Sequence, residues 1–241
     1  MNGRMTVAQR VLQFNEELAG TVLELPPGFA VINPFSGPQK ERVREVSTAF
    51  YQKYYDDQKL RRLVLGSSPA RRGTAVTGVP FEDADLLESE TGIGIDGYAV
   101  SRSSSGFLHD VIRRYGGRQE FYADFVMSFV CPLGLVRANA KGKEVNCNYY
   151  ETKALRENLH PFIVDAMKRQ LAFGIDTSVC YCIGSGENFK FLSKVNGDQR
   201  FFRKIVPLEH PRFITQYNPE RKGDFVDKYI GALRERAADQ L

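Results

Sequence analysis

The chain has 241 residues, of which 42% are hydrophobic and 26% charged, and this composition is typical of a globular protein rather than a disordered one. The formal net charge of +4 permits binding to nucleic acid without establishing it, because charge must be clustered to act on a partner. No run of about 18 apolar residues occurs and polar side chains are spread through residues 1–19, so we expect no membrane span, no signal peptide and a cytoplasmic location.

The first half of the chain predicts two helices and one buried strand. Apolar residues at helical spacing predict helices over residues 6–18 and 40–55, and a Pro- and Gly-rich segment over residues 26–38 separates them. A short apolar strand over residues 61–66 runs directly into Ser67, Ser68 and Pro69. The glycines and the proline of residues 73–80 predict a loop.

The second half of the chain alternates strands with helices. We expect strands over residues 125–131, 178–183 and 202–208, and helices over residues 151–173, 187–195 and 224–236. Buried strands alternating with helices predict an α/β fold, a three-layer α/β/α arrangement around a mainly parallel four-stranded sheet. Because no repeat, low-complexity tract or linker interrupts the pattern, we expect a single domain over residues 1–241.

Polar, glycine and proline residues follow each of the four predicted strands. The segments are Ser67-Ser68-Pro69, Cys131-Pro132, Gly184-Ser185-Gly186 and His210-Pro211. In open α/β sheets ligands bind beyond the carboxyl ends of the strands. We therefore expect the active site at this edge of the sheet.

Four cysteines occur, at positions 131, 147, 180 and 182, and no two of them have the two-residue gap that is typical of zinc or redox sites. Their spacing does not support an iron–sulfur cluster either. We expect buried free thiols in a reducing compartment, and no metal or cofactor.

A segment after the first strand resembles a known motif. Residues 65–81 read LGSSPARRGTAVTGVPF, which resembles the first motif of the single-strand-selective monofunctional uracil-DNA glycosylases: Gly-x-Asn-Pro-Gly, six further residues, then Thr-Gly-Val-Pro-Phe. The INPF of residues 32–35, the VCPL of residues 130–133 and the LEHPR of residues 208–212 resemble other segments of that family in the same order. The last motif is similar to that of a second, bacterial subgroup. The resemblance implies the fold of the uracil-DNA glycosylase superfamily.

Three positions depart from the motif pattern of this family. Ser68 corresponds to the Asn that holds the attacking water, and Ala70 corresponds to the following Gly. Phe129 stands where the family has its base-reading Asn, two residues before the Cys-Pro pair. The first departure bears on catalytic strength, and the last bears on the choice of base.

The resemblance implies catalytic roles for His210 and Ser68. Cleavage of an N-glycosidic bond builds negative charge on the departing base, and a donor such as His210 stabilises that charge. Ser68 would position a water, although its hydroxyl offers one donor where an Asn amide offers two donors and an acceptor. The alternatives are a histidine that caps a turn and a serine that caps the next turn.

The same resemblance implies base-binding and DNA-binding residues. Phe81 would stack on a flipped base, against the alternative of core packing. The further expected base-binding residues are Ala70, Thr74, Phe129 and Asn148, where Asn148, like Asn146, is an amide that could replace the missing base reader. The expected DNA-binding residues are Arg71, Arg72, Arg212 and Phe213. Arg71 and Arg72 would contact phosphates, and Arg212 and Phe213, with Ile214, would form the wedge that fills the gap left by the flipped base. Glu82, Asp83 and Asp85 are expected at a helix N-terminus rather than as catalytic acids.

The leading hypothesis is a monomeric, monofunctional DNA glycosylase that removes uracil or another deaminated base from single- or double-stranded DNA. No lysine lies in the matched motifs, so a Schiff-base lyase step is not expected. The alternative is a DNA-damage or single-stranded-DNA binding protein of the same fold that cleaves weakly or not at all. An unrelated nucleotide-binding enzyme is disfavoured, because Gly184-Ser185-Gly186 lacks the third glycine of the dinucleotide motif.

Overall fold

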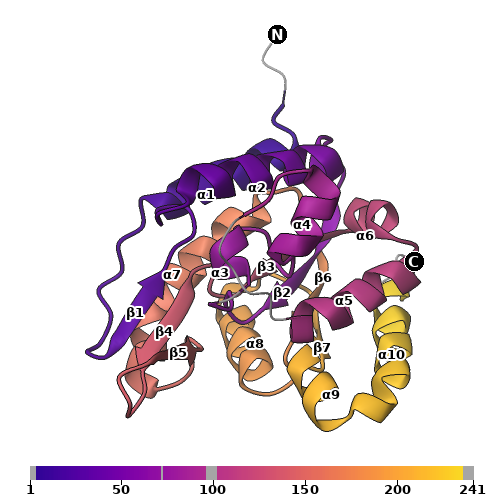
Figure 1. The fold of residues 1–241 in the computed structure, drawn as a ribbon. Helices are drawn as coiled ribbons and strands as arrows, with labels where there is room; N and C mark the ends of the chain where they lie inside the picture. Colours follow the sequence, from indigo (N-terminus) through magenta and orange to yellow (C-terminus); the bar gives the residue numbers. More distant parts are fainter. Residues whose placement is uncertain (1–3, 72, 96–101, 236–241) are drawn as a thin grey trace.

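A four-stranded parallel sheet forms the centre of the computed structural model, which describes residues 4–71, 73–95 and 102–235. The strands lie in the order β3-β2-β6-β7 (Figure 1). Their bounds are β2 (Arg61–Gly66), β3 (Phe125–Phe129), β6 (Ile175–Ile183) and β7 (Lys204–Leu208). The predicted fold class, an α/β fold with a parallel four-stranded sheet between helices, is confirmed.

Helices cover both faces of this sheet. The chain passes from β2 to β3 in one direction through α3 (Thr74–Thr77), α4 (Ala84–Thr91), α5 (Arg102–Tyr115) and α6 (Arg118–Asp124). It then passes in the other direction, through α7 (Lys153–Leu171) to β6 and through α8 (Glu187–Gln199) to β7. Right-handed crossovers in opposite directions place the two sets of helices on opposite faces. In agreement, α6 contacts β2 and β3, whereas α7 and α8 contact β6.

The remaining helices lie at the two ends of the chain. Helix α1 (Val7–Ala19) packs on α2 (Lys40–Tyr55), and Thr6 and Gln9 form a capping box at the start of α1. Helices α9 (Pro211–Tyr217) and α10 (Lys222–Arg234), joined by the 3-10 turn η1 (Pro219–Arg221), both pack on α5. The predicted helices and core strands are present, with ends shifted by a few residues.

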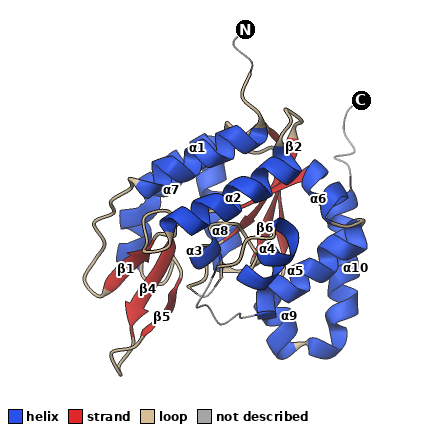
Figure 2. Ribbon diagram, turned by 45° about the horizontal axis from the view of Figure 1, so that its top comes forward, coloured by secondary structure: helices blue, strands red, loops and turns tan. Residues whose placement is uncertain are grey.

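A second, antiparallel sheet was not predicted from the sequence. It contains β1 (Phe29–Ile32), β4 (Gly134–Ala138) and β5 (Glu144–Cys147) in the order β1-β4-β5, and extends from one side of the central sheet (Figure 2). The first of these strands lies in the segment 26–38, where proline and glycine obscure a strand of four residues. Such short, partly exposed strands carry little hydrophobic periodicity.

The prediction of a loop over residues 73–80 was wrong in part. The four-residue helix α3 lies inside it and ends at Gly78, which has a φ of 70°. The expectation of a helix N-terminus at the acidic residues after Phe81 is confirmed, because Asp83 caps α4 and accepts a hydrogen bond from the Leu86 N–H. All four cysteines are buried free thiols, as expected. No described helix is long and apolar enough to cross a membrane.

Arg61 begins the central strand β2 and is fully buried, with a relative exposure of 1%. Its guanidinium makes two hydrogen bonds to the carboxylate of Asp57, at 2.7 and 2.9 Å, and donates to the backbone oxygens of Tyr122 and Tyr54. The hydrogen bond from Arg61 holds the pKa of Asp57 below its ordinary value. Arg61 therefore joins the end of α2, the start of β2 and α6 by polar contacts within the core.

We predict that Arg61→Leu lowers the free energy of unfolding by about 3 kcal/mol, because the buried backbone oxygens lose their donor. The control Arg42→Leu removes an ion pair to Glu45 in which both side chains are about half exposed, and it should cost less than about 1 kcal/mol. Urea unfolding measures both. Because the pKa of Asp57 is depressed in the folded state, its contribution is present at neutral pH and lost as the pH falls through that pKa. Equal stabilities of the two variants would contradict this role of Arg61.

Candidate active site

The loop that follows β2 is held by the side-chain amide of Asn148, which comes directly after β5. The hydroxyl of Ser67 donates to Oδ1 of Asn148 at 2.9 Å, and the hydroxyl of Ser68 donates to the same oxygen at 3.4 Å. The Nδ2 group of Asn148 has no hydrogen-bond partner in the described part of the chain, so it remains a donor beside Ser68. The sequence alone did not predict a role for Ser67. Only the fold shows that its hydroxyl donates a hydrogen bond to Asn148.

The next residues of this loop are tied to β5. The backbone N–H of Arg71 donates to Oδ1 of Asn146 at 2.9 Å. Ala70 is exposed, and its carbonyl oxygen accepts hydrogen bonds from the N–H groups of Gly73 and Ala75. Arg72, expected at the phosphates, lies outside the described residues. Hydrogen bonds to Asn146 and to the N–H groups of Gly73 and Ala75 thus fix the backbone of Ala70 and Arg71 near the surface.

Phe81 has a backbone conformation that only a strong local constraint can hold. Its φ is +61°, in the left-handed region, where a bulky residue costs about 1–3 kcal/mol. Its N–H donates to Oγ1 of Thr74 at 3.0 Å, so the expected base-binding residue Thr74 positions Phe81. The half-buried ring of Phe81 stacks on the buried ring of Phe129, with centroids 5.0 Å apart and planes at 28°. The two expected base-binding aromatics are therefore brought together.

Gly66, the last residue of β2, makes room for both rings. A Cβ atom there would lie 2.6 Å from Cζ of Phe81 and 2.8 Å from Cδ1 of Phe129. The space beside Gly66 is therefore filled by these two rings.

A mostly apolar pocket lies beside Phe129. Among its lining residues are Thr74 and Phe129 from the site and Asn15 from α1. Nδ2 of Asn15 is buried and has no hydrogen-bond partner in the described part of the chain. The pocket therefore lies between the site and α1, beside the edge strand β3.

His210 follows β7 and is the N-cap residue of α9. Its Nδ1 accepts a hydrogen bond from the backbone N–H of Arg212 at 3.1 Å. Burial, and then the charge of Arg212, lower the pKa of His210 below its ordinary value of 6.5. A neutral imidazole that accepts at Nδ1 carries its proton on Nε2. His210 is thus a neutral histidine with an Nε2–H donor.

Helix α10 fixes the backbone on the other side of His210. The hydroxyl of Tyr229 donates to the backbone oxygen of Glu209, and Nζ of Lys228 pairs with the carboxylate of Glu209 at 2.5 Å. After His210, Arg212 and Phe213 are exposed on α9, with Phe213 at 47% relative exposure. Nε of Arg212 donates to the side chain of Gln216. Of the expected wedge residues, Arg212 and Phe213 therefore lie on the surface, whereas Ile214 is buried.

The sequence-predicted residues form two groups at the carboxyl edge of the sheet. One group surrounds the end of β2 and contains Ser68, Ala70, Arg71, Thr74, Phe81, Phe129 and Asn148. The other follows β7 and contains His210, Arg212 and Phe213. Strand β6 lies between β2 and β7. A ligand that reached from Phe81 to His210 would thus lie across the end of β6, as in other parallel sheets.

Comparison with known proteins defines the class. The family model of the uracil DNA glycosylase superfamily matches residues 52–234, so the chain belongs to this superfamily and has the fold of its DNA glycosylases. Its structure is similar to the crystal structure of wild-type Pedobacter heparinus SMUG2, with a TM-score of 0.89 and 44% sequence identity over 95% of this chain and 97% of that one. A comparison with curated proteins gave no match. The predicted resemblance to the single-strand-selective glycosylases is confirmed.

We predict that Gly66→Ala destabilises the protein by about 1–3 kcal/mol, because the new methyl group overlaps the two rings. The control is Gly106→Ala in α5, where an added Cβ meets no atom within 4 Å, and it should stabilise by about 0.5–1 kcal/mol. Urea unfolding compares the two. A neutral effect of Gly66→Ala would contradict the close packing of Phe81 and Phe129 over this residue.

We predict that His210 titrates below pH 6.5 and carries its proton on Nε2 at neutral pH. The change Arg212→Ala removes a nearby positive charge and keeps the backbone N–H, so the pKa of His210 should rise while Nδ1 stays an acceptor. Nitrogen-15 NMR of the imidazole measures both the pKa and the tautomer, with His210→Ala to assign the signals. A proton on Nδ1 at neutral pH would contradict the hydrogen bond to Arg212.

Proposed function

We propose that the protein is a monofunctional DNA glycosylase that hydrolyses the N-glycosidic bond of uracil or another deaminated base, as a single domain and a monomer. The observation that carries the proposal is the neutral His210, whose Nε2–H is free to donate because the backbone occupies Nδ1. Membership of the superfamily, whose enzymes act on DNA, supports DNA as the partner.

The chemistry separates charge between the sugar and the base. As the N-glycosidic bond breaks, its electron pair leaves with the base, and the sugar carbon becomes electron-poor. A donor such as Nε2–H of His210, aimed at a base oxygen, stabilises the departing anion. Water then bonds to the sugar carbon, and the proton that it loses neutralises the base. No lysine nucleophile and no cofactor enter this proposal.

Ser68 and Asn148 together supply what one asparagine supplies in the family motif. The Ser68 hydroxyl donates toward Oδ1 of Asn148, which leaves the lone pairs of the serine as acceptors for a water. The Nδ2 of Asn148, which has no partner among the described residues, adds the donors that a serine lacks. The pair thus offers an acceptor and donors side by side, and this arrangement supports an attacking water held between them.

The DNA surface in this proposal extends over the two site groups. Phe81, backed by Phe129, gives a flipped base an aromatic face, which binds any base plane. Arg71 and Arg212 would contact phosphates, and the exposed Phe213 would fill the gap left by the base. The second candidate is a binding protein of the same fold that cleaves weakly, which is favoured by Ser68 in place of the family asparagine.

The test is a base-release assay with oligonucleotides that carry uracil, xanthine or hypoxanthine, followed by alkali to reveal abasic sites. We predict that the wild type releases at least one of these bases, and that His210→Ala lowers the rate about 100- to 1000-fold by removing one charge-stabilising donor. DNA binding and circular dichroism should be unchanged in the variant. Wild-type turnover by His210→Ala would contradict the role of this residue.

We predict that Asn148→Leu damages base release more than Ser68→Ala, because the leucine removes the donors while alanine leaves Nδ2 in place. Ser68→Asn combined with Ala70→Gly should maintain or raise the rate, since it restores the family pattern. Single-turnover rates on the preferred base measure these changes, and filter binding checks the affinity for DNA. A wild type that binds DNA and releases none of the three bases would favour the binding protein over the glycosylase.

A further inference from the structure

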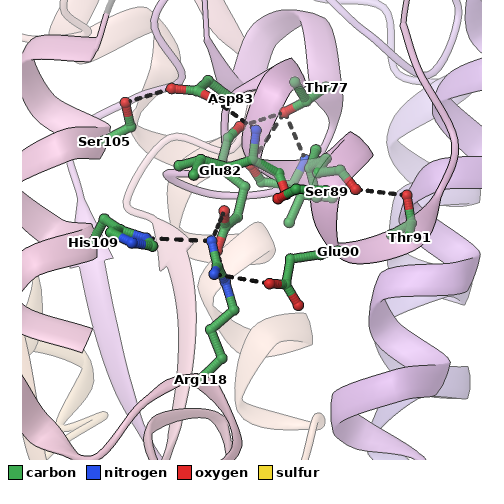
Figure 3. Close-up of polar contacts among 12 residues, drawn as sticks. Thr77, Glu82, Asp83, Ser89, Glu90, Thr91, Ser105, His109 and Arg118 are labelled. Atoms are coloured by element: carbon green, nitrogen blue, oxygen red, sulfur yellow. Dashed lines mark hydrogen bonds and ion pairs between the residues drawn. The ribbon is translucent and has the colours of Figure 1, made fainter. Parts of the chain in front are cut away.

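The backbone that presents Phe81 is pinned at three consecutive residues. The Phe81 N–H donates to the Thr74 hydroxyl. The Glu82 backbone oxygen accepts from the Thr77 hydroxyl at 3.0 Å, and the Asp83 carboxylate accepts from the Ser105 hydroxyl at 2.8 Å (Figure 3). A left-handed conformation at a non-glycine residue persists only where its surroundings determine it completely. The contacts of residues 82 and 83 are therefore part of what determines the position of the Phe81 ring.

The side chain of Glu82 also holds this segment. Glu82 directly follows Phe81 and has a relative exposure of only 3%. The Glu82 carboxylate accepts hydrogen bonds from Nε and a terminal nitrogen of Arg118, at 3.3 and 3.2 Å. It also accepts one from the hydroxyl of Tyr122, at 2.6 Å. Both donors belong to α6, so a helix 36 residues further along the chain holds the Phe81 segment.

Arg118 also connects this segment to two more helices. It pairs with Glu90 of α4 at 3.0 Å and contacts Nδ1 of His109 of α5 at 3.4 Å. Figure 3 shows the guanidinium between these groups, with Glu82 on one side and Glu90 on another. The Arg118 side chain is 13% exposed. The guanidinium thus fixes α4, α5 and α6 relative to the residue that follows Phe81.

Stability alone does not account for this arrangement. A buried ion pair is often no more stabilising than apolar side chains of the same volume, because both charges lose their hydration. What it does supply is a single defined geometry, since a planar guanidinium and a carboxylate fit in few orientations. Such a geometry is what a strained residue at a site requires.

We propose that Arg118 and Tyr122 are positioning residues for base release, and that they act through Glu82 to hold the Phe81 ring in its stacking position. This inference rests on the proposed glycosylase function. Tyr122 is 2% exposed and the Arg118 side chain 13% exposed, so in this proposal neither contacts the base directly. Their removal should therefore reduce the rate of base release from bound DNA and leave affinity for undamaged DNA unchanged.

The experiment uses Tyr122→Phe and Arg118→Lys, which each keep a side chain of similar size in place. Single-turnover base release should fall about 10- to 100-fold, as expected for a misplaced contact group. In the Phe81→Gly background, which removes both the ring and the strain of a positive φ, the same two changes should have no further effect on base release. Their effects on unfolding free energy should remain in both backgrounds.

A stability-matched control separates positioning from general destabilisation. Val195→Ala removes two methyl groups from a fully packed site in α8, where Val195 is 1% exposed. It should lower the stability without slowing base release. If Val195→Ala slows base release as much as Tyr122→Phe, or if the effects of Tyr122→Phe and Phe81→Gly on base release are independent, the proposal is overturned.

Amide hydrogen exchange gives a readout that needs no activity. In Tyr122→Phe and Arg118→Lys the Phe81 N–H should exchange about tenfold faster or more, while the amides of β6 keep their protection. Unchanged exchange at Phe81 overturns this proposal even in an active enzyme. A wild type that releases no base contradicts the glycosylase function, whereas the exchange at Phe81 still decides whether α6 holds this residue.

Discussion

The carboxyl end of β2 has no room for a side chain, and the candidate site is built around that constraint. Gly66 pairs with Phe129 in the parallel register, and the rings of Phe129 and Phe81 both lie where a Cβ of Gly66 would be. The pairing continues past the strand ends, because the N–H of Val130 donates to the Gly66 oxygen at 2.8 Å and that of Cys131 to the Ser67 oxygen at 2.9 Å. Backbone hydrogen bonds therefore join the start of the Ser68 loop to the chain just after Phe129.

The polar groups of the site are arranged by backbone and amide contacts rather than by charges. Arg212 supplies its backbone N–H to orient His210, and Asn148 orients both Ser67 and Ser68. In each case the group with no partner among the described residues is a neutral donor, Nε2–H of His210 or Nδ2 of Asn148. Neutral donors suit a reaction in which negative charge appears only as the bond breaks, because they do not attract anions before that point.

The central sheet and the motif residues could be predicted from the sequence. The contacts that the motif residues make in the folded protein could not. Strands such as β2 and β3 are buried on both faces, so they appear as continuous apolar runs. The strands of the second sheet are only four or five residues long and partly exposed, which gives no clear period. Glu82 and Arg118 are 36 residues apart, on an extended segment and on a helix. No local pattern relates two such positions, and only the packing of α4, α5 and α6 brings them together.

A phenylalanine at position 129, where the family motif has an asparagine, changes how a pocket of this kind could distinguish one base from another. An asparagine at the end of β3 would form hydrogen bonds with the donors and acceptors along the edge of a base. A base with the wrong pattern would leave the polar groups of the asparagine unpaired and would be rejected. A phenylalanine has none, and here its ring is buried against Phe81, where it supports the stacking face. Stacking responds to the area of a base far more than to its pattern of donors and acceptors. In the proposed enzyme the identity of the base must therefore be read by the polar groups that remain, and the Nε2–H of His210 is such a donor. Donors select for oxygen atoms, and the deaminated bases differ from their parents by having an oxygen where the parent carried an amino group.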